Sequence, residues 1–261
     1  REFLRSVPKP FCVALEAGRN WYWPYDLLEQ EAAEVKLCHP AKTRLIADAR
    51  IKTDKVDARI LADLLRTNYL PTCYVPDMET RQRRELLRHR AFLVRIRTRV
   101  KNRIHSLIDK AGVEHPFEDL FTRSGLEFLK GLSLPWAYQR ELKDCLELID
   151  FLTVKEKEQN QLITKLCKET PDAQLLNTLP GFGYHNALLV AQEMADPNRF
   201  PDGPHFASYC GLVTSVHISD RTVYYGHITK QGNRWLRWIF IEAAHFARRH
   251  SNRFGKLYQR V

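Results

Sequence analysis

The sequence predicts an α/β layer followed by a mainly helical region. Three observations carry this prediction. Strand-like and helix-like patterns alternate over the first 67 residues, an apolar seven-residue repeat runs through residues 80–112, and apolar helical patterns dominate residues 179–261. Alternating strands and helices are typical of a parallel sheet, whereas a seven-residue repeat favours a helical hairpin or coiled coil. We therefore expect α/β plus α architecture with a long helical linker.

Two short apolar runs predict strands in the N-terminal part. Residues 11–17 (FCVALEA) carry one carboxylate, Glu16, near the end of the run, and residues 34–40 (EVKLCHP) stop at a proline. Such short runs are typical of buried strands. Two strands make a poor sheet, and the sequence begins with Arg rather than Met. We therefore expect further strands and interpret the chain as N-terminally truncated.

Helical patterns follow each predicted strand. One helix starts near Pro24, between the two strands, and a second covers residues 53–67, where an apolar stripe repeats with helical spacing. Strand, helix, strand, helix in this order predicts parallel pairing of the strands. We expect this α/β domain to cover residues 1–72.

Residues 80–112 predict one long basic helix. Ten Lys or Arg and a single acid, Glu85, fall between residues 81 and 103. A second helical stretch, residues 139–169, is expected to pack antiparallel to it. The repeat consists of Leu86, Leu93, Val100 and Leu107. A basic face this dense favours nucleic-acid contact, although a face that is merely solvated is the alternative. We assign residues 73–170 to a basic helical, coiled-coil region.

Residues 171–261 predict a mainly helical C-terminal domain. Gly181 and Gly183 form a tight turn before an apolar helix, where backbone N–H groups could bind a phosphate. A plain connection between two helices is the equally weighted alternative. Residues 209–237 are interrupted by glycines and serines, which we interpret as loop signals. They read as an irregular, exposed polar segment that ends in an amphipathic helix, with Gln231, Gly232 and Asn233 as the turn and cap that begin it.

Composition favours a polyanionic partner. The net charge is +10 and the pI about 9.4, as in many nucleic-acid-binding proteins. Six scattered cysteines without a Cys-x-x-Cys pair give neither a zinc site nor a disulfide framework. No membrane span or signal peptide is predicted. We expect a cytoplasmic protein without a membrane partner.

Asp54 and Asp57 lie one helical turn apart, so both side chains can project from one face. Together with Glu16 they could bind a hard cation such as Mg²⁺, and two-metal sites use such carboxylates in phosphoryl transfer. The alternative is a solvated helix start whose charges pair with one another, since the acids lie among Lys52, Lys55 and Arg59. The spacing alone favours that alternative.

Two motif blocks carry a resemblance to the DEDD transposases, insertion-sequence recombinases with a Holliday-junction-resolvase-like (RuvC, RNase H-like) N-terminal domain. LEAGRNWYWPYDLL and KTDKVDARILADLLR resemble that domain. LNTLPGFGYHNALLVAQEMADPNRF and GLVTSVHISDRTVYYGHITKQGNRWLRWIFIEAA resemble the family's C-terminal transposase domain. The resemblance covers nearly the whole chain and implies a partial RNase H-like domain, a Mg²⁺ cofactor, donor and target DNA, and a structured guide RNA.

The resemblance also implies site residues. Glu16, Asp54 and Asp57 match the family's metal-binding and catalytic acids, while the first aspartate has no counterpart in this chain. Ser219 matches the nucleophilic serine, although Asp220 replaces the usual glycine and Thr214 a common proline. A covalent phosphoserine would conserve the energy of the broken phosphodiester. The serine of one protomer is expected to meet carboxylates of another, in a homodimer or homotetramer.

Cations and glycines complete the predicted nucleic-acid interface, whose alternative role is ordinary surface charge. Lys230, Arg234 and Arg237 are expected near Ser219. The full set is Arg88, Arg95, Arg99, Lys101, Arg103, Gly181, Gly183, Lys230, Arg234 and Arg237.

Three other interpretations stay open. The pattern His245-x-x-Arg248 with Tyr258 is similar to that of tyrosine recombinases, although their tyrosine normally falls further downstream. The chain could instead be a catalytically inactive, nucleic-acid-binding remnant of a transposase, or a helical scaffold whose basic face is only solvated.

Overall fold

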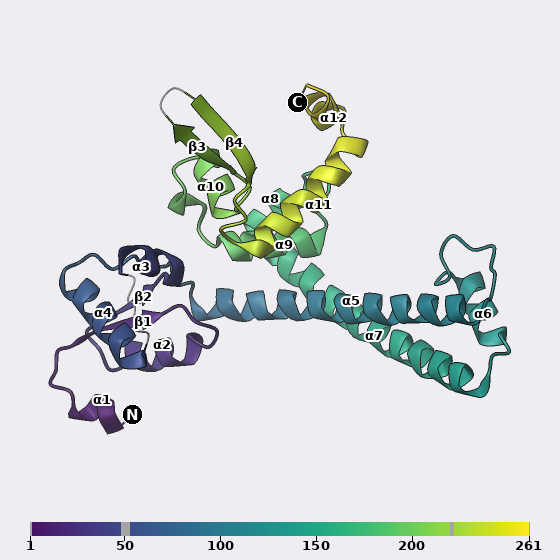
Figure 1. Ribbon diagram of the computed structural model, residues 1–261, viewed down its shortest axis with the longest axis horizontal. Helices are drawn as coiled ribbons and strands as arrows, with labels where there is room; N and C mark the ends of the chain where they lie inside the picture. The colour runs from purple at the N-terminus through teal and green to yellow at the C-terminus, as the bar shows by residue number, and fades with distance from the viewer. Residues whose placement is uncertain (1, 48–52, 220–221, 261) are drawn as a thin grey trace. The chain divides into compact units, whose positions relative to one another are not determined.

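A computed structural model describes residues 2–47, 53–219 and 222–260 (Figure 1). The chain divides into two compact units, Arg1–Asp77 and Met78–Val261. The structure is mixed α/β, as predicted, and mainly helical. Asp220 lies outside the described residues. Within the described ranges, every helix is too short or too polar to pass through a bilayer.

The first unit is built on two parallel strands. Strand β1 (Cys12–Glu16) pairs with β2 (Glu34–Cys38), with Cys12 opposite Glu34 and Glu16 opposite Cys38. Parallel strands need a crossover connection, which here contains helix α2 (Tyr22–Glu29); α2 packs against β2 and helix α4 (Asp54–Arg66) against β1. The predicted strand–helix–strand–helix order and parallel pairing are confirmed.

Two short helices were not predicted in this unit: α1 (Glu2–Ser6) and α3 (Pro40–Ile46). Pro40 ends the strand, as expected, but it also starts α3 because proline fits the first turn of a helix. The buried apolar core of the described part of this unit is small and consists of Tyr25, Leu37, Cys38 and Leu70.

The second unit contains a long helical hairpin. Helix α5 (Met78–Lys110) packs along helix α7 (Trp136–Glu169). Pairs such as Arg97–Glu156 and Arg90–Asn160, 3.1 Å apart in each case, show that the two helices run antiparallel. The predicted long helix and its antiparallel partner are confirmed.

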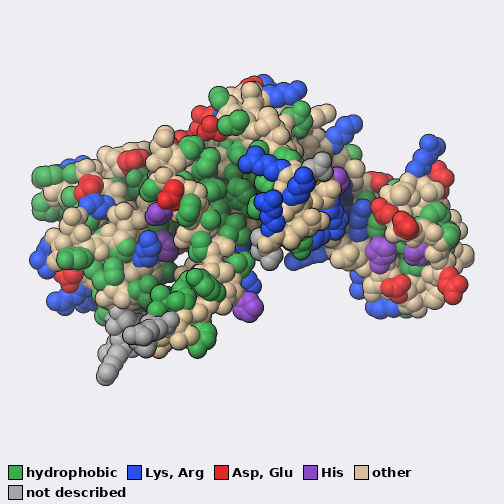
Figure 2. All heavy atoms as spheres, turned by 90° about the horizontal axis from the view of Figure 1, so that it is seen from above, with side chains coloured by type: hydrophobic (Ala, Val, Ile, Leu, Met, Phe, Trp, Pro, Cys, Tyr) green, Lys and Arg blue, Asp and Glu red, His purple; other side chains and the backbone are tan. Residues whose placement is uncertain are grey.

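A core of apolar side chains joins the hairpin to helix α6 (Arg123–Gly131) at one end. The α6 end of the hairpin lies on the right of Figures 1 and 2. On the face drawn in Figure 2, Asp and Glu are frequent at this end, whereas Lys and Arg gather toward the middle of the view. The buried residues of this core are Ile104, Leu107, Ile108, Leu120, Leu129, Leu142, Leu146 and Ile149.

A second core joins the other end of the hairpin to the C-terminal helices. It unites Leu87 of α5 and Cys167 of α7 with helices α8 (Pro171–Asn177), α9 (Tyr184–Met194) and α11 (Arg234–His250). The predicted boundary between residues 170 and 171 therefore falls within a shared core; the three-part division itself stays a prediction. The remaining elements are η1 (Pro197–Arg199), α10 (Gly203–Tyr209) and α12 (Asn252–Tyr258).

A β-hairpin replaces the irregular segment that we predicted before α11. Strand β3 (Thr214–Ser219) pairs antiparallel with β4 (Thr222–Ile228), and Ser219 lies opposite Thr222. The prediction of an irregular segment was wrong because it gave weight to glycine and serine. The β-branched and aromatic residues of TSVHIS and TVYYGHI favour strands instead.

Candidate carboxylate site and nucleic-acid interface

The three predicted acids lie on adjacent elements of the first unit. Glu16 is the last residue of β1, and Asp54 and Asp57 occupy the first turn of α4, which packs against β1. The side chain of Thr53 caps α4 by accepting a hydrogen bond from the backbone N–H of Val56 (3.2 Å). All three acids are exposed. Two aspartates in a first turn also stabilise the helix through its dipole, so their structural role is satisfied without a ligand.

These acids are not gathered into a metal site. Among the described residues, no three His, Cys, Asp or Glu side chains lie close enough together to hold a metal ion. Carboxylate oxygens are the donors that Mg²⁺ prefers, so the residue types fit the cation while their arrangement does not. Like charges disfavour one another when no cation separates them. The assignment of Glu16, Asp54 and Asp57 as metal ligands stays a prediction.

Ser219, the predicted nucleophile, is exposed at the end of β3. Most of the hairpin is solvent-exposed on both strands, so this hydroxyl is accessible to a large ligand. Thr214, in the place of the common proline, begins the same strand and lies opposite Ile228. The acids belong to the first unit and Ser219 to the second.

The loop between β4 and α11 is held by backbone and side-chain contacts. Lys230 adopts a positive φ of 54° and its carbonyl accepts a hydrogen bond from Arg237 Nη1 (3.0 Å). The same nitrogen lies 3.3 Å from the carbonyl oxygen of Cys210. Arg237 therefore shapes this loop, a role that the sequence did not suggest. The side chain of Lys230 and that of Arg234 are exposed.

Asn233 caps helix α11, as predicted. Its Oδ1 accepts hydrogen bonds from the backbone N–H groups of Trp235 (2.9 Å) and Leu236 (3.3 Å). The preceding Gly232 has a φ of 142°, and a Cβ there would lie 2.2 Å from the carbonyl oxygen of Tyr209. Only glycine fits this close approach.

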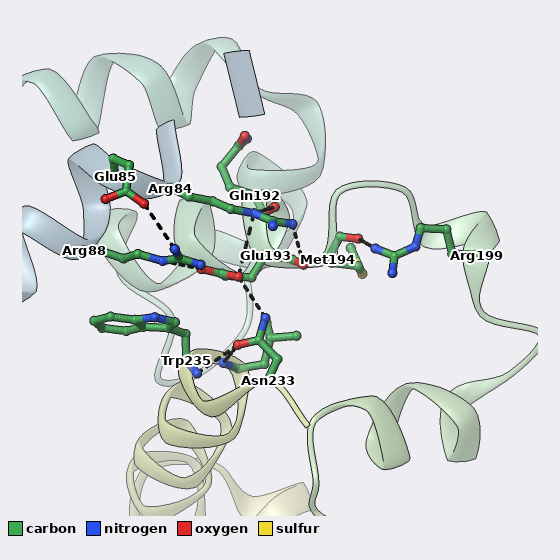
Figure 3. A network of polar contacts seen from close by, with 10 residues as sticks. Arg84, Glu85, Arg88, Gln192, Glu193, Met194, Arg199, Asn233 and Trp235 are labelled. Atoms are coloured by element: carbon green, nitrogen blue, oxygen red, sulfur yellow. Dashed lines mark hydrogen bonds and ion pairs between the residues drawn. The ribbon is translucent and has the colours of Figure 1, made fainter. Parts of the chain in front are cut away.

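A buried ion network links α5, α9 and α11 (Figure 3). The carboxylate of Glu193, 1% exposed, lies 2.7 Å from Arg88 Nη2 and accepts a 2.8 Å hydrogen bond from Asn233 Nδ2. Arg84 donates to the backbone carbonyls of Gln192 (2.9 Å) and Glu193 (3.0 Å). Sequence reasoning missed this network; its only signal was an acid inside the apolar run ALLVAQEM.

The basic face of α5 is partly used by the protein itself. Of the predicted nucleic-acid contacts, Arg88 binds Glu193, Arg103 binds Glu141, and Lys101 lies 4.3 Å from the ring centre of Phe121. Arg95 and Arg99 are exposed. A cation paired within the protein attracts a polyanion less than an unpaired one, so fewer of the ten cations are available to the predicted nucleic-acid interface than the sequence suggested.

The two glycines of the predicted phosphate-binding turn differ in their surroundings. Gly181 has a φ of +89°, and a Cβ there would lie 2.8 Å from the Cα of Ala243 in α11. Gly183 caps α9 with extended backbone and faces open space. Gly181 is thus explained by helix packing alone, whereas Gly183 leaves room for a ligand at the start of α9.

Burial shifts the pKa of His185 in α9 and of Cys210, which belongs to the core that joins the hairpin to the C-terminal helices. Burial lowers the pKa of His185, whose Nε2 lies 3.3 Å from the carbonyl oxygen of Leu87. Burial raises the pKa of the Cys210 thiol to about 11, against an opposing effect of Arg237. Both groups are therefore neutral at pH 7 and act as packing residues.

Comparison with known families matches both halves of the chain. A model of the IS110-type DEDD domain, described as "Transposase", matches residues 3–112, which include all three acids. A model described as "Transposase IS116/IS110/IS902 family" matches residues 173–259, which include Ser219. The order of the two matches is the order that the motif blocks predicted.

Individual relatives are similar along most of the chain. A "Probable family 20 transposase" of Pseudomonas aeruginosa is 29% identical over 94% of this chain and 73% of its own length. "Putative transposase y4qE" of Sinorhizobium fredii is 28% identical over 94% of this chain and 60% of its own. The "Transposase for insertion sequence element IS1111A" of Coxiella burnetii is 24% identical over 92% and 66%. Family models thus match both halves of the chain, which is similar to transposases of the IS116/IS110/IS902 family.

Proposed function

We propose that this protein is a DNA transposase that cleaves and rejoins DNA strands, with Ser219 as its nucleophile. The observation that carries the proposal is the placement of Ser219, exposed at the end of a strand whose partner leads into the loop fixed by Arg237 and Asn233. A nucleophile that attacks a phosphodiester of bound DNA needs an accessible hydroxyl on a segment whose position is fixed. The exposed Ser219 and the loop held by Arg237 and Asn233 fit these two requirements. The matches of both halves to transposase family models support the reaction class.

The proposed reaction exchanges one phosphodiester for another. The Ser219 hydroxyl oxygen forms a bond to phosphorus, one sugar–oxygen bond to phosphorus breaks, and the released sugar oxygen takes up the proton lost by serine. The hydroxyl of another strand end then attacks the phosphoserine and restores the serine. No ATP is needed because each step replaces one phosphate ester by another. Serine is a weak nucleophile at neutral pH and needs activation.

Glu16, Asp54 and Asp57 are the residues that we propose to hold a divalent cation, Mg²⁺, in an assembled complex. When bound, such a cation would offset negative charge on the scissile phosphate. Their carboxylates are exposed, and the described part of the chain supplies no hydrogen bond or ion pair to them. They are therefore available to a ligand from outside the unit, including DNA or a second copy of the chain.

A strand-exchange assay on the DNA element that encodes the protein tests this proposal. Ser219→Ala and Asp54→Ala should each abolish exchange, because each removes a reacting or cation-binding group. Ser215→Ala, in the same strand, is the matched control and should retain it. Exchange that persists in Ser219→Ala would overturn the assignment of the nucleophile.

A catalytically inactive, nucleic-acid-binding remnant is the second candidate, favoured by the finding that no three described acidic or ligating side chains are gathered around a metal position. In that case Mg²⁺ would leave DNA chemistry unchanged, while DNA binding would still weaken steeply with salt.

A structured guide RNA and a homodimer or homotetramer remain part of the transposase proposal. Copurified RNA and the mass of the complex in solution test them.

Tyr258 is a rival nucleophile with one supporting contact. The guanidinium of Arg248 lies 4.6 Å from the ring centre of Tyr258, so two of the three residues of the tyrosine-recombinase pattern meet. Such a contact is also an ordinary cation–π pair. DNA linked to Tyr258 in a Ser219→Ala variant would favour a tyrosine recombinase.

A further inference from the structure

We propose that a pocket between α5 and the start of α11 binds an unstacked base of single-stranded nucleic acid. This inference rests on the proposed function and adds a ligand conformation and a binding site to it. The pocket is lined by Arg90, Ala91, Val94, Arg95, Arg234, Trp235 and Trp238.

The lining combines aromatic rings with cations and contains no acid. Its volume of about 370 Å³ lies at the lower end of the range for small-molecule sites, which suits one base. Four residues come from one face of α5 at positions 90, 91, 94 and 95, and three from one face of α11 at positions 234, 235 and 238. The site is thus built on two rigid helices of the same unit.

Trp235 forms the supporting wall. The guanidinium groups of Arg95, Arg234 and Arg88 lie 5.3, 5.5 and 5.9 Å from its ring centre. Figure 3 shows Trp235 beside Arg88 and directly after the capping Asn233. These cation–π contacts, together with the buried network behind them, hold the ring in place before any ligand arrives.

Trp238 offers a free surface. It is 41% exposed, and its ring centre lies 6.1 Å from that of Trp235 with an interplanar angle of 68°. An exposed tryptophan next to a fixed one is a platform on which a base can stack, as in proteins that bind single strands without sequence preference. Bases within a duplex are already stacked on one another, so an unpaired strand suits this platform better.

The cations around the platform are available for phosphates. Arg95 and Arg234 are exposed, and no described carboxylate forms an ion pair with either. Arg95 donates through Nε to the carbonyl of Ala91 (3.2 Å), which fixes the side chain and leaves its terminal nitrogens for a ligand. Arg90, the third lining arginine, donates a hydrogen bond through Nε to Asn160 Oδ1 (3.1 Å). Arginines alone would suit an acidic protein surface as well as a nucleic acid, whereas the stacking face of Trp238 favours the nucleic acid.

The test measures the affinity of the full chain for labelled single strands by fluorescence anisotropy. An oligothymidylate and an oligouridylate of about 12 nucleotides match a typical single-strand site. Trp238→Ala should weaken binding of the strand by about tenfold, and Trp238→Phe should retain most of it because a stacking face remains. Phe246→Ala, an exposed aromatic of α11 that does not line the pocket, should bind like the wild type.

Arg234→Gln is a second variant and should reduce both affinity and the steepness of its salt dependence. A preference for one of the two oligonucleotides identifies DNA or RNA as the ligand; equal binding supports a site that reads features common to both. Unchanged affinity in Trp238→Ala, or equal losses in Trp238→Ala and Phe246→Ala, would overturn the inference. Strand exchange and its dependence on Ser219 would then still stand, so the two failures are distinguishable.

Discussion

The carboxylate of Glu193 in α9 lies 2.7 Å from Nη2 of Arg88 in α5, in a position that is almost completely buried. The same carboxylate binds Asn233, the residue that caps α11. One acid thereby joins the long basic helix to the helix that follows the Ser219 hairpin. The arrangement of the predicted DNA-contacting segments depends on this acid.

Removing Glu193 should destabilise the second unit strongly. Glu193→Ala leaves the buried guanidinium of Arg84 and the partly buried one of Arg88 without their carboxylate, and loss of one partner of a buried pair costs about 3–5 kcal/mol. Urea unfolding followed by circular dichroism measures the loss. Glu85→Ala is the matched control, because Glu85 also pairs with Arg88 (3.2 Å) but is exposed; we expect less than about 1 kcal/mol there. Similar losses in the two variants would contradict this account.

The two glycines of the α8–α9 turn should respond differently to alanine. Gly181→Ala places a Cβ against the α11 backbone at a positive φ, so we expect a lower melting temperature. Gly183→Ala meets open space at extended backbone, so the unfolding free energy should stay within about 0.5 kcal/mol of the wild-type value and the melting temperature should change little. If a phosphate binds at the start of α9, Gly183→Ala should weaken DNA binding without this loss of stability. Equal melting temperatures for both variants would show that the helix contact at Gly181 is not limiting.

The stability of the fold should fall as pH drops through the range of histidine titration. Burial lowers the pKa of His185 in the folded state, so the unfolded chain binds a proton first. The stability that this group contributes is present above the unfolded pKa of about 6.5 and is lost as pH falls toward the folded pKa. Between about pH 7.5 and about pH 5, the unfolding free energy of the wild type should fall more than that of His185→Gln, because glutamine does not titrate. Parallel curves would contradict it.

Alkylation should separate the cysteines by burial. Cys12 is exposed, whereas Cys38, Cys167 and Cys210 are buried. Burial raises the pKa of Cys210 to about 11, so little of its reactive thiolate is present at pH 8. Iodoacetamide followed by peptide mass spectrometry should label Cys12 first and Cys210 only after denaturation. Labelling of Cys210 in the folded protein at the rate of Cys12 would show that this core opens readily.

Local patterns were sufficient to predict the longer helices, such as α4, α5 and α7, and the parallel strand pair, but not the short helices α1 and α3. The apolar runs at residues 11–17 and 34–40, and the seven-residue repeat on α5, indicate which face of each element is buried. This information is contained in the local sequence because the spacing of apolar residues follows the geometry of the strand or helix. Asn233 was predictable as a cap because capping is a local hydrogen bond. The β3–β4 hairpin was missed although its alternating strands are also local, because its glycine and serine residues were read as loop signals.

Long-range contacts were not predictable in the same way. The partners of Arg84 and Arg88 lie more than one hundred residues away along the chain, and no local pattern distinguishes a buried arginine from a surface one. For the same reason the basic face of α5 was read as free charge. The pocket at Trp235 and Trp238 also requires two helices to meet. The carboxylate assignment came from a resemblance and stays a prediction within this structure.

Covalent capture of DNA tests the central claim most directly. The wild-type protein is incubated with its encoding element, denatured, digested and analysed by mass spectrometry for a nucleotide-modified peptide. We predict a modification on Ser219 that is absent from Ser219→Ala and retained by Ser215→Ala. A modification on Tyr258, or an adduct that persists in Ser219→Ala, would contradict the claim that the exposed serine at the end of β3 is the nucleophile.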